Sequence, residues 1–181
     1  MSEILLENTL ETVRSQKLIA AGTAWGDRIA ANTASASLTF TTSGVSTGSV
    51  SSQITAGKHS FTVDEPAALA GDDVAASPVE FALGALISCQ VVVYRLYAQQ
   101  LGLKIDSLEV NADADLDVRG LFGIEATVRP GFGDVRLKVK IDGPETRERY
   151  EELQAAVDTH CPVLDIFTNP TPVSVELVTS N

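Results

Sequence analysis

A chain of 181 residues with 44% hydrophobic and 20% charged residues has the composition of an ordinary globular protein and is long enough to bury one core. Its 13 basic and 24 acidic residues leave a formal net charge of −11, which argues against nucleic acid and anionic membranes as partners. Two cysteines are too few for a disulfide framework or a zinc cage, and no signal-peptide pattern opens the chain, so we expect a cytoplasmic protein with no metal and no cofactor.

The first predicted element is a helix over residues 3–20. Its apolar side chains recur at steps of four and three, as on a helix with one apolar stripe: Leu6, Leu10 and Val13. Two glycines and an aspartate then interrupt the pattern: Gly22, Gly26 and Asp27. We therefore predict an added helix over residues 1–22 and one main domain over residues 23–181.

The Ser/Thr-rich stretch from Thr33 to Ser52 is predicted to form sheet rather than to be disordered. Its apolar side chains alternate with polar ones, which is typical of a strand: Ala36, Leu38 and Phe40. Two further β-prone segments, residues 51–55 and 59–63, flank Ala56-Gly57 and predict a hairpin. A loop is expected over residues 64–76.

The next stretch predicts a buried helix. Ser77, Pro78 and Glu80 have the spacing of a capping box with proline in the first helical turn. Gln90 is the only strongly polar side chain between Phe81 and Val93, so we expect this helix to be buried on most sides. The apolar run is shorter than the ~20 residues that a bilayer span needs. The helix continues to Gln100, and Gly102 offers a stop.

The second half of the chain predicts two strands, a helix and a last strand. Apolar and polar residues alternate from Ile105 to Val118 and again in the second strand: Val135, Leu137, Val139 and Ile141. A helix opening at residues 142–145 has an inward stripe: Tyr150, Leu153, Val157 and Cys161. A final strand follows a turn at residues 169–172: Val173, Val175 and Leu177. The order of elements indicates an α+β fold with an antiparallel sheet around a buried helix.

Apart from the cysteines, a set of three aspartates and one histidine are weaker candidates for function. Asp113, Asp115 and Asp117 have the spacing of a calcium loop, but the sixth position, which must be glycine, is Val118. We interpret the three carboxylates as a solvent-exposed face of a strand. His59, one of two histidines, could be catalytic, although a hairpin histidine is more often part of an amphipathic surface.

Cys89 and Cys161 are the strongest candidates for chemistry. Buried cysteines are usually inert packing, but both of these occupy inward-facing helix positions. Small residues near Cys89 leave room for an approaching molecule: Gly84, Ala85 and Ser88. Cys161 lies between His160 and Pro162 at a helix end. If the two sulfurs meet, one thiolate can attack, become a sulfenic acid and be captured by the other as a disulfide.

The sequence contexts of the two cysteines carry a family resemblance. The first runs from Ser77-Pro78-x-Glu80-Phe81 to Cys89, and the second from Cys161-Pro162-Val163 to Asn169-Pro170-Thr171-Pro172-Val173. Together they resemble the OsmC/Ohr family, as does the segment His59-Ser60-Phe61-Thr62-Val63-Asp64-Glu65-Pro66. The resemblance covers the chain from Trp25 to Leu177.

The resemblance implies an OsmC-like α+β fold and an intertwined homodimer with its active sites at the subunit interface. It also implies thiol-dependent reduction of organic hydroperoxides, with a hydroperoxide as substrate and an external dithiol as reductant. By match of position, Cys89 would attack the peroxide and Cys161 would resolve the sulfenic acid. Family members hold the thiolate with an arginine from an N-terminal segment, and Arg28 is the candidate here.

A second interpretation is a non-catalytic dimer of the same fold that binds a small apolar ligand or acts as a redox sensor. Characterised peroxidase branches have a glutamate directly after the helix-opening proline, where this chain has Val79. A free thiol with a pKa of ~8.5 is only a few per cent thiolate at neutral pH, and burial raises that pKa. Lowering the pKa by about two units, roughly 2.7 kcal/mol, requires a cation near Cys89.

Overall fold

The computed structural model describes residues 3–180, and their side chains from residue 10 onward. Its helices are α1 (Glu3–Ala31), α2 (Pro78–Leu101), α3 (Val118–Leu121), α4 (Arg147–His160) and α5 (Pro162–Thr168), with short 3-10 helices at Thr33–Ala36 and Ala67–Leu69. Its strands are β1 (Thr42–Ser46), β2 (Ser52–Ala56), β3 (His59–Val63), β4 (Ser107–Asp115) and β5 (Asp134–Asp142). The α+β prediction is confirmed.

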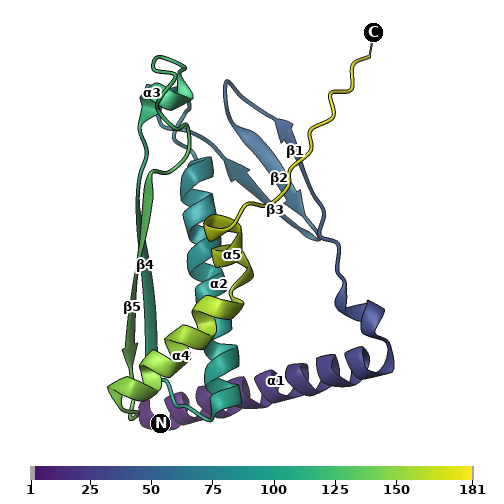
Figure 1. Ribbon diagram of the computed structural model, residues 1–181, viewed down its shortest axis with the longest axis vertical. Coiled ribbons are helices and arrows are strands. Elements are labelled where there is room, and N and C mark those ends of the chain that lie inside the picture. The colour runs from purple at the N-terminus through teal and green to yellow at the C-terminus, as the bar shows by residue number, and fades with distance from the viewer. Residues whose placement is uncertain (1–2, 181) are drawn as a thin grey trace.

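Helix α2 is the axis of the molecule (Figure 1). The antiparallel hairpin β4–β5 lies along one side of it, α4 and α5 cross it, and α1 passes beneath its C-terminal end. The antiparallel meander β1–β2–β3 stands on the other side and contacts the start of α2, where Phe61 stacks on Phe81 with ring centroids 5.0 Å apart.

The predicted hairpin over residues 51–63 is confirmed. Ala56 pairs with His59, which leaves a two-residue turn, and Gly57 occupies the left-handed region with φ of 58°. The predicted strand through Leu38 and Phe40 is wrong, because a 3-10 helix precedes them and both side chains are exposed. The side chain of Asn32 accepts a hydrogen bond from the Ala34 N–H at 3.1 Å, and this local bond favours a turn over a strand.

The two long strands confirm the alternating pattern. Val110 pairs with Val139 and Ala112 with Leu137, so the apolar residues of β4 and β5 share the face that packs toward α2. The connection between the strands contains α3 and exposes Leu121 and Phe122.

Helix α1 is longer than the sequence pattern indicates. It continues through Gly22, Gly26 and Asp27 to Ala31, so the predicted stop there is wrong. A glycine in a helix interior costs only about 1 kcal/mol, and many alanines in this segment favour the helix. Leu10 and Val13 are exposed rather than facing α2, and Leu6 lies outside the described side chains. The division of the chain after residue 22 stays a prediction.

The start and end of α2 confirm the sequence signals. The Ser77 N–H donates to Glu80 Oε2 at 2.7 Å, and the Glu80 N–H donates to Ser77 Oγ at 3.4 Å, which completes the capping box. Gly102 ends the helix in the left-handed conformation, with φ of 67°.

Replacing Ser77 with alanine is expected to lower the free energy of unfolding by about 1 kcal/mol, because the free N–H groups of the first turn lose their acceptor. Chemical denaturation at one fixed protein concentration measures the change. Ser88→Ala is the matched control: its exposed hydroxyl bonds only to the Ala85 carbonyl in the same helix, and the change should stay within about 0.5 kcal/mol. Equal effects of the two substitutions would contradict the capping role.

The core joins α2 to α4 and to the segment that leads into β4. Its buried residues are Val93, Tyr94, Ala98, Leu103, Ile105, Leu153, Val157 and Cys161. Leu153 and Val157 are fully buried and Cys161 is 2% exposed, which confirms the predicted inward stripe of α4. The helix begins at Arg147 rather than at residues 142–145, because Thr146 provides the N-cap and accepts from the Arg149 N–H.

The predicted final strand is wrong within a single chain. Residues 169–180 have no regular secondary structure, and Val173, Val175 and Leu177 are all more than 80% exposed. The short helix α5, which the sequence analysis missed, precedes them. Alternation alone cannot form a strand, because a strand needs a neighbour to satisfy its backbone groups.

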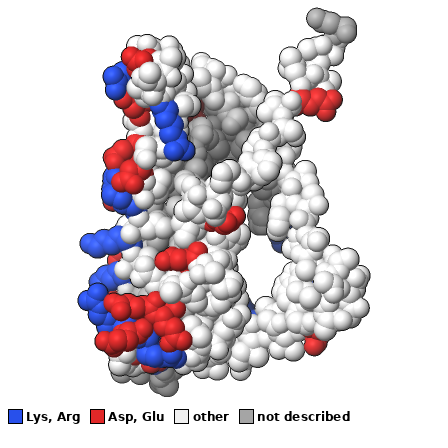
Figure 2. All heavy atoms as spheres, viewed as in Figure 1, with Lys and Arg blue, Asp and Glu red and all other residues white. Residues whose placement is uncertain are grey.

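Helix α2 is less buried than the sequence predicts. Val79 and Val92 are 39% and 56% exposed, and only 22% of its most apolar 18-residue window is buried. By length and composition the whole helix from Pro78 to Leu101 could cross a membrane, and the core helix of a soluble protein passes the same test. Charged side chains gather over β4, β5 and α4, on the left of Figure 2, whereas the opposite side of this face is mostly uncharged. The surface away from the charged hairpin is therefore mostly uncharged, and exposed apolar residues of α2 such as Val79 and Val92 add to it.

Candidate functional site

The structure brings the two predicted cysteines together. Cys89 lies in the middle of α2, and Cys161 lies between the end of α4 and the start of α5. Both are free thiols, and Cys89 packs against the buried core cluster that contains Cys161, close enough for the Cys161 thiol to influence the pKa of Cys89. Cys161 is buried and Cys89 is half-buried, so Cys89 is the more accessible sulfur. Two residues 72 positions apart in sequence thus form one thiol pair (161 − 89 = 72).

Helix α5 holds this pair in place. Pro162 sets the first helical position after Cys161, and the next backbone N–H, that of Val163, lies near enough to the Cys89 sulfur to favour its thiolate form. The first N–H groups of a helix have no partner within the helix and are free for such an interaction. The turn that positions Cys161 therefore also positions Cys89.

The surroundings of Cys89 keep it protonated in the single chain. Burial is the largest influence and raises the pKa of the Cys89 thiol above its ordinary value. The Val163 N–H favours the thiolate and works in the opposite direction, while the neighbouring Cys161 thiol raises the pKa further. The site contains a nucleophile and a second sulfur in contact with it, but activation of the nucleophile still needs a positive charge.

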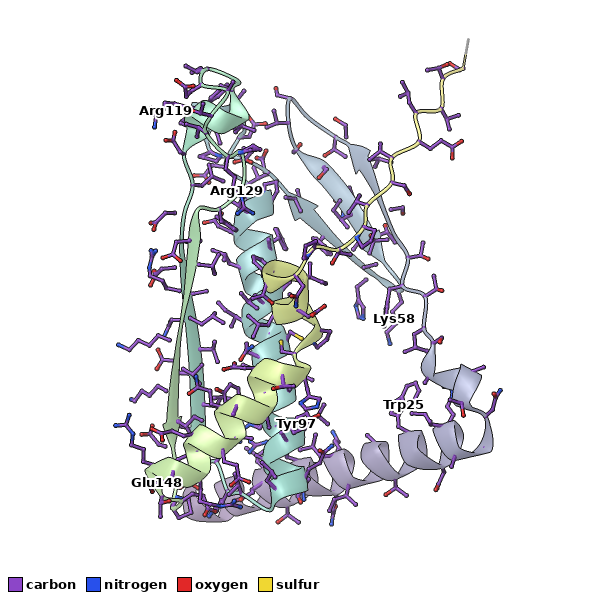
Figure 3. All side chains as sticks on the ribbon, in the orientation of Figure 1. Trp25, Lys58, Tyr97, Arg119, Arg129 and Glu148 are labelled. Atoms are coloured by element: carbon purple, nitrogen blue, oxygen red, sulfur yellow. The ribbon has the colours of Figure 1, made fainter. Side chains whose placement is uncertain are left out.

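Arg28 is not brought to the cysteines within the chain. It lies in the last turn of α1, with its guanidinium over the Trp25 ring at 4.9 Å from the ring centroid. Figure 3 shows Trp25 on the part of α1 that projects beyond α2, whereas Tyr97 lies on α2 itself. The predicted contact between Arg28 and Cys89 therefore requires a second chain.

The two histidines occupy different places. His160 precedes Cys161, stacks on Tyr97 with ring centroids 4.7 Å apart, and its Nδ1 lies 2.7 Å from the Ala156 carbonyl oxygen. These contacts fix the ring beside the end of α4. His59 is exposed at the start of β3.

Asp113 and Asp115 lie on the exposed face of β4, as interpreted from the sequence, whereas Asp117 follows the strand and is the half-buried N-cap of α3. Asp115 forms an ion pair with Arg136 at 2.5 Å, and Asp117 forms one with Arg119. Hydrogen bonds from Arg119 lower the pKa of Asp117 to about 2. Two of the three carboxylates thus already form ion pairs with arginine side chains.

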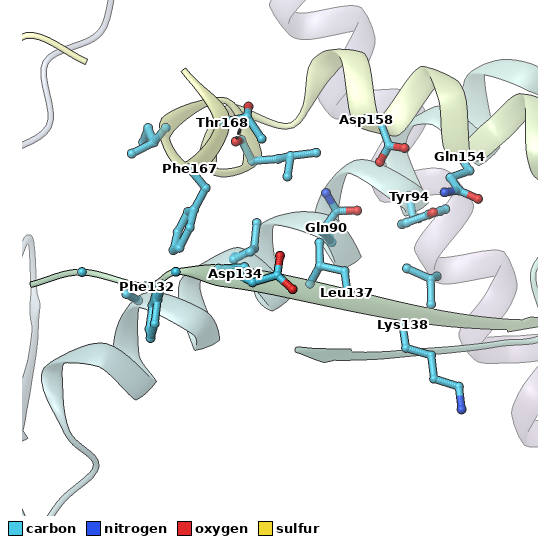
Figure 4. A pocket seen from close by; sticks show the side chains of 18 of the residues that line it. Gln90, Tyr94, Phe132, Asp134, Leu137, Lys138, Gln154, Asp158, Phe167 and Thr168 are labelled. Carbon is cyan, nitrogen blue, oxygen red and sulfur yellow. Dashed lines mark hydrogen bonds between the residues drawn. The ribbon is translucent and has the colours of Figure 1, made fainter. Parts of the chain in front are cut away.

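A cavity of about 1260 Å³ separates α2 from β5 on a neighbouring face of the helix (Figure 4). Gln90 points into it, is 1% exposed, and its Nε2 has no hydrogen-bond partner among residues 3–180. Burial, with a smaller contribution from Asp158, raises the pKa of Tyr94 to about 12, so its hydroxyl stays protonated at neutral pH. The sequence did single out Gln90 as the only strongly polar residue in the apolar run, but gave no reason to expect a cavity beside it.

Replacing Gln90 with leucine is expected to raise the free energy of unfolding by about 1 kcal/mol, because a buried amide without a partner is removed at nearly constant volume. Thermal or chemical denaturation measures the change. Gln154→Leu, at an exposed position on the same cavity, is the control and should change stability by less than about 0.5 kcal/mol. Destabilisation by Gln90→Leu would mean that the amide is hydrogen-bonded in solution.

The chain is an α+β protein with a dithiol site. It has a central apolar helix, two antiparallel sheets and a pair of core thiols that lie close to each other. The family model for OsmC-like protein matches residues 71–176, which include Cys89 and Cys161. The chain belongs to this family, and its fold is OsmC-like.

Solved structures with the same fold share little sequence with this chain. The OsmC-like protein from Mycoplasma pneumoniae is 18% identical, with a TM-score of 0.63 over 72% of this chain and 87% of that one. The organic hydroperoxide resistance protein OsmC from Legionella pneumophila is 19% identical, with a TM-score of 0.56 over 72% and 90%. OhrB from Bacillus subtilis, another organic hydroperoxide resistance protein, is 19% identical, with a TM-score of 0.53 over 72% and 91%. No curated protein matches the chain.

Proposed function

We propose that this protein is a cytoplasmic, dimeric thiol peroxidase that reduces organic hydroperoxides through Cys89 and Cys161. The contact between the two thiols in the core is the observation that carries the proposal. Membership of the OsmC-like family and similarity to structures named organic hydroperoxide resistance proteins support it.

The reaction uses both thiols and an external reductant. The Cys89 thiolate attacks the peroxide O–O bond, which gives a sulfenic acid on Cys89 and an alkoxide that takes up a proton to become an alcohol. The Cys161 sulfur then attacks the sulfenic sulfur, a disulfide forms and water leaves. An external dithiol reduces the disulfide and is itself oxidised. Because Cys89 packs against the core cluster that contains Cys161, we expect the disulfide to form with little rearrangement of the core.

The proposed dimer supplies what the single chain lacks. Burial raises the pKa of Cys89, and a cation within a few ångströms lowers it again. Arg28 lies on a projecting helix and is free to reach the partner's Cys89 in a dimer. The uncovered apolar faces of α2 and of residues 173–178 would be buried in the same assembly.

The cavity beside Gln90 favours a second candidate function, the binding of a small ligand with an apolar body and one hydrogen-bond acceptor. Leu86, Leu137 and Phe167 supply apolar walls, and the unpartnered amide supplies a donor. In this case both cysteines stay reduced, and ligand binding raises the melting temperature without peroxide consumption.

Peroxide consumption separates the two functions. With cumene hydroperoxide and dithiothreitol, the peroxidase should consume peroxide at a second-order rate at least about a hundredfold above that of the same concentration of free cysteine. A rate equal to that of the free thiol would exclude the peroxidase function and leave ligand binding as the remaining candidate. Sedimentation at micromolar concentration should show a dimer. A compact monomer would exclude the proposed contact between Arg28 and Cys89 of the partner subunit.

A further inference from the structure

We propose that the outer half of helix α1, residues 18–31, is an arm that packs against the second copy of this chain. The proposal rests on the dimer of the proposed function and adds an interface element to it. The OsmC-like family model begins at residue 71, so this helix lies outside the matched region.

The inner half of α1 shows which face of the helix makes contacts. Ser15 Oγ donates a hydrogen bond to Gln99 Oε1 at 2.8 Å, and Glu11 lies 3.6 Å from Lys104 Nζ. Leu18 is half-buried on the same face and lines a small cavity with Leu103. One face of α1 is therefore seated on the C-terminal end of α2.

The same face continues along the arm, where its contacts within the described chain are local ones, with Arg28 over the Trp25 ring and with the 3-10 helix Thr33–Ala36. Its residues follow Leu18 at steps of four, three and four, the spacing that places side chains in one seam between packed helices: Gly22, Trp25 and Ile29. Trp25 and Ile29 are 39% and 37% exposed. A Cβ built on Gly22 would have no atom of the described chain within 4 Å, apart from the helix itself. The opposite side of the helix is polar or small, with Asp27 at its centre.

A second copy of this chain is the occupant that the surface favours. Figure 2 shows an opening bounded by the arm, the meander and the α2 region, and the surface around it is mostly uncharged. A chain with a net charge of −11 repels its own copies through its acidic surfaces, so self-association needs an uncharged face. The arm, the meander and the exposed C-terminal segment all stand on the side of α2 away from the charged hairpin (Figure 1). They lie around the opening on one side of the molecule, where a partner of the same kind would pack.

The only tryptophan of the chain reports on the arm directly. In the intact dimer, Trp25 should emit at short wavelength and resist quenching by acrylamide, because the second copy covers it. Ile29→Glu should raise the dimer dissociation constant at least about tenfold and restore quenching of Trp25, because it places a carboxylate in the apolar seam. Ala20→Glu, on the opposite face of the same helix, should change neither.

The outcomes distinguish a failure of the proposed arm contact from a failure of the proposed dimer. A native dimer whose Trp25 is as easily quenched as free tryptophan would overturn the arm and leave the dimer of the proposed function in place. Equal dissociation constants for Ile29→Glu and Ala20→Glu would do the same, with far-ultraviolet circular dichroism checking that both variants are folded. A native chain that sediments as a monomer at all concentrations tested would overturn both.

Discussion

Replacing Cys89 with serine is expected to lower kcat/KM for cumene hydroperoxide by at least about a thousandfold. A serine hydroxyl is not ionised at neutral pH and cannot accept the peroxide oxygen to form a sulfenic acid, so the covalent route is lost. The half-buried sulfur of Cys89, in contact with Cys161, is the group that the reaction needs. Peroxide consumption with dithiothreitol as reductant measures the effect.

Cys161→Ser is the matched control, because it keeps the attacking sulfur and removes the resolving one. This variant should reduce about one equivalent of peroxide and then stop, with a sulfenic acid on Cys89 that dimedone traps. If Cys89→Ser retained activity while Cys161→Ser lost it, the roles of the two cysteines would be reversed. If both variants matched the native rate, the thiol pair would be structural packing.

Replacing Arg28 with alanine is expected to slow peroxide reduction at pH 7 by about a hundredfold. Burial raises the pKa of Cys89, and the cation of the partner subunit is proposed to lower it by about two units. Without that cation the thiol is mostly protonated at pH 7. Each unit of added pH then raises the thiolate fraction about tenfold until the pH passes the new pKa. The pH-rate profile should therefore shift upward by about two units, and the difference from the native protein should vanish at high pH.

Two control variants make this prediction specific to Arg28. Arg28→Lys keeps a positive charge and should recover part of the lost rate at pH 7. Arg129→Ala removes a cation from the cavity beside Gln90 and should leave the pH-rate profile unchanged. An unchanged profile for Arg28→Ala would exclude Arg28 as the activating group, whatever the dimer looks like.

The parts of the fold that were predicted from the sequence are those that local chemistry determines. Ser77 and Glu80 lie three residues apart and complete a capping box within one helical turn. Val110 and Val139 alternate with polar neighbours on strands that pair with each other. In these places the signal and its partner are close in sequence, or the pattern repeats over many residues.

The parts that were mispredicted depend on distant or external partners. Val173, Val175 and Leu177 alternate like a strand, yet no neighbouring strand is present in the described chain. Gly22 and Gly26 looked like a helix stop, but a helix tolerates single glycines when the surrounding residues favour it. Burial of α2 was overestimated, because a run of apolar residues does not show which faces of a helix the rest of the chain covers.

The candidate site was predicted in part. Cys89 and Cys161 were found from their helix positions and family contexts, and the structure places their thiols in contact. The influence of the Val163 N–H on the pKa of Cys89 was missed, because nothing in the pattern showed that a new helix starts directly after Cys161. Arg28 was chosen from the family resemblance. In the single chain it lies on Trp25 and away from Cys89, and a sequence does not show where a residue lies relative to another chain.

The most direct test of the thiol pair is the intact mass of the reduced protein after one equivalent of cumene hydroperoxide. The account predicts the loss of two hydrogen atoms and a single disulfide between Cys89 and Cys161, reversed by dithiothreitol. An unchanged mass, or a stable gain of one oxygen atom on Cys89 with Cys161 still reduced, would contradict the account.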